Sequence, residues 1–199
     1  MNHSKSHTLV KMMFKNLLLA SLSGLAAAAP ADTKIVSNPS FQVISLRSAS
    51  DIHFSKVTAA NSSLFLGLAD QGASCDRGEK PDAATFYLKS GELFLYKTDN
   101  PPQQIYADRS GMGQGRLGYI TGAQSPPRNA ELTGWEIDGD GNLTLEGASL
   151  RACLGANDAW VVWVSVGSAN PNGYDKCLGF TARTGNIEDP VSCLYTQQS

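Results

Sequence analysis

A glycine-rich segment, residues 109–124, contains a spacing that is known for binding phosphate groups of cofactors. Gly113, Gly115 and Gly118 follow the pattern Gly-x-Gly-x-x-Gly of dinucleotide-binding proteins. That chemistry needs a helix that begins at the third glycine, so that the phosphate rests on the helix N-terminus. Here the chain continues with Tyr-Ile-Thr-Gly and soon reaches Pro126 and Pro127, which indicates a strand and a turn. We therefore predict a structural glycine hairpin and no cofactor.

Three acidic residues are the candidates for hydrolytic chemistry or for binding a metal ion. Asp138, Asp140 and Glu146 lie in and after the sequence Asp-Gly-Asp-Gly-Asn, and a pair of carboxylates is what a glycosidase uses. The same stretch resembles the start of a calcium loop, but Ser149 stands where that loop needs its last acidic ligand. Asp-Gly and Gly-Asn favour hairpin turns, so we interpret these acids as exposed turn residues and predict no metal site.

A nucleophile triad needs a histidine, and His53 is the single histidine beyond the first 31 residues. It lies on an expected strand. The sequence contains no Gly-x-Ser-x-Gly motif, which would mark a nucleophilic serine. A lone histidine in a strand is more typical of a packed or surface side chain than of a general base. The prediction is that the protein is not an enzyme.

Four cysteines, Cys75, Cys153, Cys177 and Cys193, indicate two disulfides in an exported chain, with three possible pairings. A zinc site is disfavoured because the chain has no Cys-x-x-Cys pair. Cys153 and Cys177 flank the apolar stretch 160–166 and could join the elements beside it, which would leave Cys75 for Cys193. The sequence leaves the pairing open.

Aromatic residues and glycosylation sequons are the remaining candidate sites. Trp135, Trp163 and Tyr96 are candidates for stacking on sugar rings, although large aromatic residues more commonly fill a core. Asn61 and Asn142 each begin an Asn-x-Ser/Thr acceptor sequence for N-glycosylation.

The N-terminal segment is typical of a secretory signal peptide. Three lysines without any acidic residue precede an apolar block, and Ala29-Pro30-Ala31 offers small residues for cleavage. We expect residues 1–31 to be the signal peptide and residues 32–199 to form one domain. Removing those three lysines from 16 basic and 18 acidic residues leaves 13 against 18, a formal net charge of −5. Such a charge gives no electrostatic reason to bind nucleic acid or an anionic membrane.

Hydrophobic residues beyond the leader recur with a period of two, which predicts strands. The expected strands are residues 41–46, 52–58, 63–68, 85–89, 92–96, 104–108, 134–138, 142–145, 149–153, 160–166 and 177–182. The stretch 160–166 is apolar on both faces, so we expect it to be central and covered on both sides. Short, even spacing between turns predicts a single compact antiparallel all-β domain. Both a β-sandwich and a β-trefoil-like arrangement fit.

Several motifs resemble a known family. They are, in chain order, Ala73–Arg77, Ala84–Leu88, Gly91–Tyr96, Asp108–Gln124, Gly134–Asp138, Ala152–Cys153 and Ser192–Gln197. Together they look like the phialide cell-wall proteins of filamentous fungi (the PhiA type), and the resemblance spans the chain from about Val43 to its end. It implies an exported cell-wall protein needed for phialide and conidium development, without assigned catalytic residues, and some relatives are similar to mould allergens. More loosely, the chain is similar to the C-terminal domain of yeast wall proteins with internal repeats, but it lacks the repeats.

The predicted function is that of a secreted, non-catalytic cell-wall protein of asexual sporulation. Its expected partners are cell-wall polysaccharide or other wall proteins. The alternatives are a soluble polysaccharide-binding module, which would need an exposed aromatic platform, and a secreted hydrolase, which would need a concave site around Asp138 or Asp140.

Overall fold

The computed structural model describes residues 38–122, 124–155 and 158–198. The expected signal peptide, residues 1–31, lies outside this part of the chain. The strands are β1 (Ser40–Leu46), β2 (Val57–Ala60), β3 (Ser63–Leu66), β4 (Ser74–Cys75), β5 (Phe86–Lys89), β6 (Glu92–Leu95), β7 (Gln103–Asp108), β8 (Arg116–Thr121), β9 (Trp135–Ile137), β10 (Leu143–Leu145), β11 (Leu150–Leu154), β12 (Trp160–Val164), β13 (Cys177–Ile187) and β14 (Cys193–Leu194). Two short 3₁₀ turns, η1 (Asp76–Gly78) and η3 (Pro171–Gly173), lie between strands.

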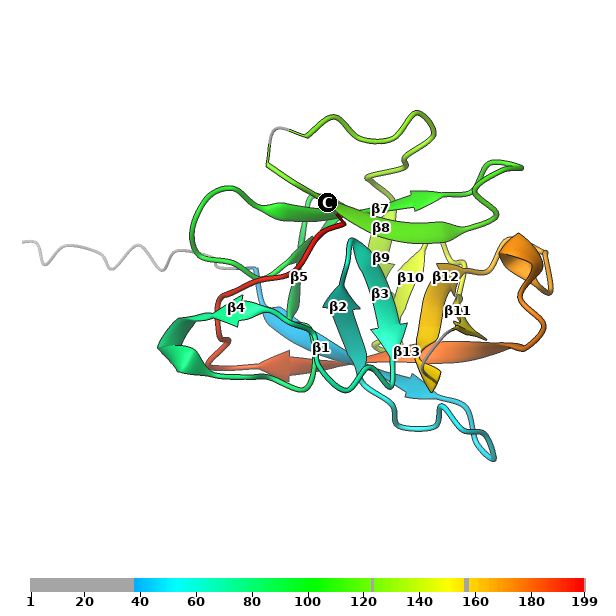
Figure 1. Cartoon of the computed structure of the whole chain (residues 1–199), viewed down its shortest axis with the longest axis horizontal. Coiled ribbons are helices and arrows are strands. Elements are labelled where there is room, and N and C mark those ends of the chain that lie inside the picture. The colour runs from blue at the N-terminus through cyan, green and yellow to red at the C-terminus, as the bar shows by residue number, and fades with distance from the viewer. Residues whose placement is uncertain (1–37, 123, 156–157, 199) are drawn as a thin grey trace, which may run out of the picture. The chain divides into compact units, whose positions relative to one another are not determined.

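Eight strands close into a ring. Their order is β11-β13-β1-β5-β6-β7-β8-β12, and β12 pairs back with β11. β3 also pairs with β12 and carries β2 at its other edge, while β9–β10 and β4–β14 form two separate ribbons. In Figure 1, β7 and β8 cross the top of this barrel and β1 and β13 its bottom. The all-β prediction is confirmed, and the strand pairs of the described residues are antiparallel.

Ring closure argues against the sandwich, one of the two arrangements that the sequence left open. A sandwich consists of two separate sheets that face each other. Here hydrogen bonding continues from strand to strand around the barrel, and the last strand of the ring, β13, pairs with every residue of β1. A closed barrel with added hairpins is therefore the arrangement formed, and it removes most of the free edges that an open sheet would expose.

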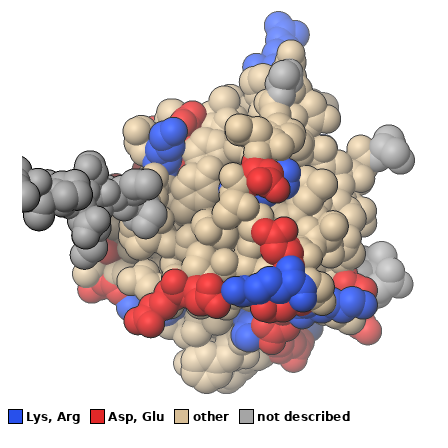
Figure 2. Space-filling model, turned by 90° about the vertical axis from the view of Figure 1, so that its left-hand side faces the viewer, with Lys and Arg blue, Asp and Glu red and all other residues tan. Residues whose placement is uncertain are grey.

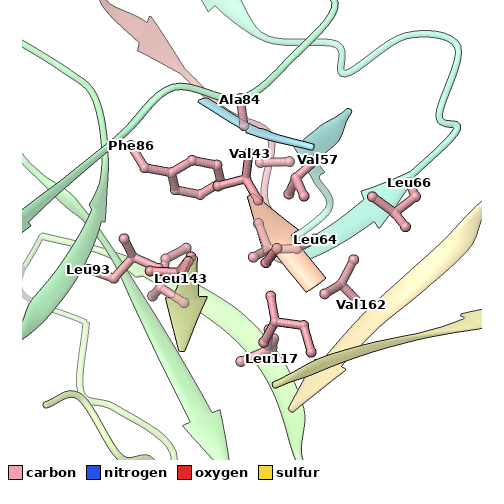
Figure 3. Close-up of a cluster of buried hydrophobic side chains, with 14 of the residues drawn as sticks. Val43, Val57, Leu64, Leu66, Ala84, Phe86, Leu93, Leu117, Leu143 and Val162 are labelled. Carbon is pink, nitrogen blue, oxygen red and sulfur yellow. The ribbon is translucent and has the colours of Figure 1, made fainter. Parts of the chain in front are cut away.

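The core fills the inside of the ring with residues that alternate along the strands. Val43 of β1, Leu64 of β3 and Leu117 of β8 are among the buried side chains of this cluster. Figure 3 shows such side chains pointing toward one another from strands that are distant in the sequence. The expected position of the apolar stretch is confirmed: β12 pairs with β11 along one edge and with β3 and β8 along the other.

One expected strand, 52–58, is wrong in its first half. Residues 51–54 form turns, and β2 begins at Val57. The buried hydroxyl of Ser45 donates to the carbonyl of Ile52, and the backbone of Ser45 bonds to Phe54 and Ser55. These bonds close the loop onto β1, so the alternation of Ile52 and Phe54 imitates a strand without forming one.

Both disulfides link residues that stand opposite each other in paired strands. Cys153 and Cys177 join β11 to β13, and Cys75 and Cys193 join β4 to β14. The two predicted disulfides are thus present, in the pairing that the stretch 160–166 suggested. Each closes a loop, with a sequence separation of 24 for Cys153–Cys177 and of 118 for Cys75–Cys193.

Charged side chains of both signs are intermingled on the surface. Figure 2 shows acidic and basic residues side by side in a band on the face that lies at the left of Figure 1, with mostly uncharged surface above it. Ion pairs such as Lys56–Asp82 are exposed, so each adds little to stability. Within the described ranges, the helical turns are too short to cross a membrane.

Candidate functional site

The outer face of β12 carries an aromatic residue that does not belong to the core. Strand alternation directs Trp160, Val162 and Val164 into the barrel and leaves Val161 and Trp163 on the outside. Trp163 is nevertheless only 4% exposed, because other segments cover it.

Those segments surround Trp163 with an open cleft of about 360 Å³. Its aromatic walls are Phe65 of β3, Trp163 of β12 and Tyr174, which follows η3. The rings of Trp163 and Tyr174 meet edge to face, with centroids 5.9 Å apart. This volume is at the lower end of the range for sites that bind small molecules.

Polar groups line the rim of the cleft and are mostly uncharged. Ser63, Asn172 and Gln198 contribute hydroxyl and amide groups, and Arg116 is the single charged residue among the described lining residues. No carboxylate lines the cleft within the described ranges. The chemistry available is therefore stacking on aromatic rings together with hydrogen bonding, which is suited to binding and offers no acid–base pair.

The glycine segment positions one wall of the cleft. Gly115 has a φ of +91°, and a Cβ there would lie 2.1 Å from the carbonyl oxygen of Val164. The same glycine accepts a hydrogen bond from the backbone N–H of Val164 at 2.8 Å. A side chain would push the β7–β8 loop away from β12, so glycine is required by close approach and not by a phosphate. The predicted structural glycine hairpin is confirmed.

Gln114 joins this loop to the opposite wall. Its side-chain Oε1 accepts a hydrogen bond from the backbone N–H of Asn172 at 2.6 Å. Met112, at the tip of the same loop, is 93% exposed at the mouth of the cleft. This hydrogen bond joins the β7–β8 loop to the segment that contains η3, and both line the cleft with Trp163.

The indole N–H of Trp163 has no hydrogen-bond partner among the described residues, although it is buried. Most buried polar groups of proteins are paired, so such an atom needs an explanation. Trp163 also lies opposite Arg151 of β11 and Arg116 of β8 in the strand register.

The structure places the other two aromatic candidates elsewhere. Trp135, in β9, is 3% exposed and belongs to the core. Tyr96 follows β6, is half-buried, and packs edge-on against Tyr87, which stacks on Phe94 at 5.1 Å. The three candidate residues do not form one site, and only Trp163 lines the cleft.

The clustered acids form a turn and an ion pair. Asp138 Oδ1 accepts hydrogen bonds from the backbone N–H groups of Asp140 and Asn142 at 2.9 and 2.8 Å. These bonds lower the pKa of Asp138, with the Asn142 backbone as the main cause. Glu146 instead pairs with Arg109 at 2.7 Å. Asp138 and Glu146 are thus held by different structural contacts, and the described residues contain no cluster with metal-binding composition.

His53 is also engaged structurally. It is half-buried in the turn after β1, where its Nδ1 accepts a hydrogen bond from the backbone N–H of Arg47 at 3.1 Å. The expectation that it lies on a strand is wrong, because that loop folds back onto Ser45.

Two cleft residues, Phe65 and Tyr174, were not singled out from the sequence. The alternation in β3 contains a signal for Phe65, since Leu64 and Leu66 are buried and Phe65 must face outward with Ser63. Nothing comparable marks Tyr174, which stands in an irregular segment and reaches Trp163 only through the fold.

Comparisons with known proteins give a consistent result. A family model described as "PhiA-like secreted protein" matches residues 41–196. Proteins named "Cell wall protein phiA" are similar over nearly all of this chain. The one from Aspergillus fumigatus is 44% identical over 187 residues, which is 94% of this chain and all of that protein. The one from Aspergillus niger is 42% identical (93% and 99% covered), and the one from Emericella nidulans is 44% identical (89% and 98% covered). No solved structure matches.

Proposed function

The chain belongs to the PhiA-like family of secreted proteins, and we propose that it is a non-catalytic structural protein of the fungal cell wall that associates with wall polysaccharide. It is a secreted protein of the cell wall. The observation that carries the finer proposal is the cleft around Trp163, which combines aromatic walls with a neutral polar rim. That combination is suited to the apolar faces and the hydroxyl groups of sugar rings.

The non-catalytic part of the proposal rests on the acids and on His53. Asp138 is occupied by turn hydrogen bonds and Glu146 by Arg109, while His53 accepts a backbone N–H. A hydrolase would need a proton donor and a second carboxylate around a bound sugar. Incubation with soluble glucan and chitin oligosaccharides should release no new reducing ends, and release above that of a boiled sample would contradict the proposal.

Wall association can be tested by co-sedimentation. The purified protein is mixed with isolated hyphal walls, insoluble chitin and insoluble β-glucan, beside Trp163→Ala and Phe54→Ala variants. Phe54 is a suitable control because it is an aromatic residue, 64% exposed, that does not line the cleft. We expect the wild type and Phe54→Ala to sediment with walls and Trp163→Ala to sediment less. Wild-type protein that stays in the supernatant with all three materials would refute the association.

A role in asexual sporulation is the developmental side of the proposal. Its support is the family resemblance of the motifs between Ala73 and Gln197. Deletion of the gene should reduce conidium production and alter phialides while hyphal growth continues. Normal conidiation in the deletion strain would contradict this role.

A further inference from the structure

The buried N–H of Trp163 is the starting point for identifying the sugar. Trp163 lines the cleft, is 4% exposed, and its Nε1 atom has no partner in the described part of the chain. Removing a donor from water without a partner is costly, so a ligand that supplies an acceptor there gains affinity. The acceptor must come within about 3 Å of Nε1. Because this atom is buried, the side chains that cover it must move aside when the ligand binds.

The surroundings of this donor favour one kind of acceptor. A sugar hydroxyl accepts one hydrogen bond but also carries its own proton, which would need a partner. The side chains of Val161, Leu117 and Phe65, which also line the cleft, offer no acceptor for such a proton. An amide carbonyl accepts without adding a donor at the same atom, and its methyl group can pack against apolar neighbours. The acetamido group of an N-acetylated sugar combines these two features.

Arg116 favours binding of the acetylated sugar over its deacetylated form. It is exposed, and it is the single charged residue among the described residues that line the cleft. A free amino sugar carries a positive charge when protonated and would be repelled by the guanidinium. No lining carboxylate of the described residues offsets that repulsion.

We propose that the cleft around Trp163 binds an N-acetylhexosamine unit of a chitin-type polysaccharide, with Trp163 Nε1 donating to the acetamido carbonyl. This inference rests on the proposed association with wall polysaccharide and specifies its ligand. The sugar ring lies among Trp163, Phe65 and Tyr174, and its hydroxyl groups reach Ser63 and Asn172 at the rim.

The test is calorimetric titration of the wild-type protein with three oligosaccharides of matched length. They are a chitin oligosaccharide, its deacetylated form at mildly acidic pH, and a β-glucan oligosaccharide. We expect the chitin oligosaccharide to bind more tightly than the glucan, and the deacetylated form to bind least. This comparison uses the unaltered protein, so it does not depend on whether a variant folds. Equal or tighter binding of the glucan or of the deacetylated form overturns the proposal, as does absence of binding to all three.

Two matched variants test the role of the N–H itself. Trp163→Phe keeps an aromatic ring but removes the donor, and we expect affinity for the chitin oligosaccharide to fall about tenfold. Trp135→Phe removes the same kind of buried, unpartnered indole N–H from the core, and it should leave binding unchanged. An unaltered affinity in Trp163→Phe, or an equal loss in both variants, contradicts the proposal. Failure of this inference leaves co-sedimentation with walls intact, whereas failure of the proposed function abolishes it in the wild type.

Discussion

Asn61 and Asn142 carry the same acceptor pattern but lie in opposite surroundings. Asn61 is exposed in the two-residue turn between β2 and β3, where it and Ser62 both have positive φ, as a tight hairpin requires. Asn142 is half-buried, and its Nδ2 donates to Asp138 Oδ2 at 3.0 Å. Its Oδ1 is buried. A glycan on Asn142 would occupy the space of the turn that Asp138 organises.

We therefore predict that the mature protein carries N-glycan on Asn61 and not on Asn142. Treatment with an N-glycosidase, followed by intact-mass measurement of wild type, Asn61→Gln and Asn142→Gln, checks this. Loss of the glycan in Asn61→Gln alone is the expected result. A glycan that persists in Asn61→Gln and disappears in Asn142→Gln would show that the surroundings in the folded state do not decide the site.

Tyr195 makes stability depend on pH at the alkaline end. It is 2% exposed, its Oη accepts a hydrogen bond from the backbone N–H of Thr85 at 3.1 Å, and burial raises its pKa to about 12. An unfolded tyrosine titrates near pH 10. The folded state holds the Tyr195 proton more tightly than the unfolded state does. The contribution of Tyr195 to the free energy of unfolding is therefore complete below about pH 10 and is lost as pH rises through about 12.

Urea unfolding measured across this range should show a fall in the free energy of unfolding to which Tyr195 contributes about 3 kcal/mol, a part that Tyr195→Phe removes. Burial also raises the pKa of Tyr119, so part of the fall should remain in the variant. At neutral pH the variant should lose about 1–3 kcal/mol, because the Thr85 N–H is left without its acceptor. An alkaline slope that is identical in wild type and variant would show that Tyr195 is not responsible.

At the scale of elements, glycine allows β7 and β8 to pair beneath a large side chain. Gly118 stands opposite Tyr106, and a Cβ at Gly118 would lie 2.5 Å from the Tyr106 Oη atom. The Tyr106 ring thus lies over β8 at Gly118, which has no side chain. The pair explains a glycine that a strand would otherwise disfavour.

Gly118→Ala should lower the free energy of unfolding by about 1–3 kcal/mol because the ring must move. Gly179→Ala, in β13, is the matched control, since a Cβ there meets nothing within 4 Å. Thermal or urea unfolding measures both variants. Combining Gly118→Ala with Tyr106→Ala should remove the clash, so the two changes together should cost less than their sum.

The elements were largely predictable, and the cleft was not. Period-two alternation identifies strands such as 41–46 and 160–166 because one face of each strand is buried in the barrel. Alternation fails at 52–55, where Ser45 takes the backbone hydrogen bonds that a strand would use. The cleft could not be derived because Phe65, Trp163 and Tyr174 come from separate elements, and only the strand order brings them together.

At the scale of the whole molecule, the two disulfides stabilise the barrel by different amounts. Cross-linking reduces the conformational entropy of the unfolded chain, and the reduction grows with the length of the loop that is closed. The sequence separation of the partners is 118 for Cys75–Cys193 and only 24 for Cys153–Cys177.

Replacing Cys75 and Cys193 by alanine should therefore cost about 1 kcal/mol more than replacing Cys153 and Cys177. Equilibrium urea unfolding of both double variants measures the difference. Each variant should also unfold at lower urea than the wild type. The opposite ranking would indicate that local packing around Cys153, which is fully buried, outweighs loop entropy.

The pairing of β1 with β13 also determines how late in translation β1 can complete its pairing. The first strand ends at Leu46 and its partner along the full length ends at Ile187, so about 140 residues must be translated between them. At ribosomal rates of about 5–20 residues per second, β1 is complete roughly 7–30 s before β13. During that interval Phe41 and Val43, which end in the core, lack the strand that pairs with β1 along its full length. We therefore expect the nascent chain to need the chaperones of its export route until translation is nearly complete.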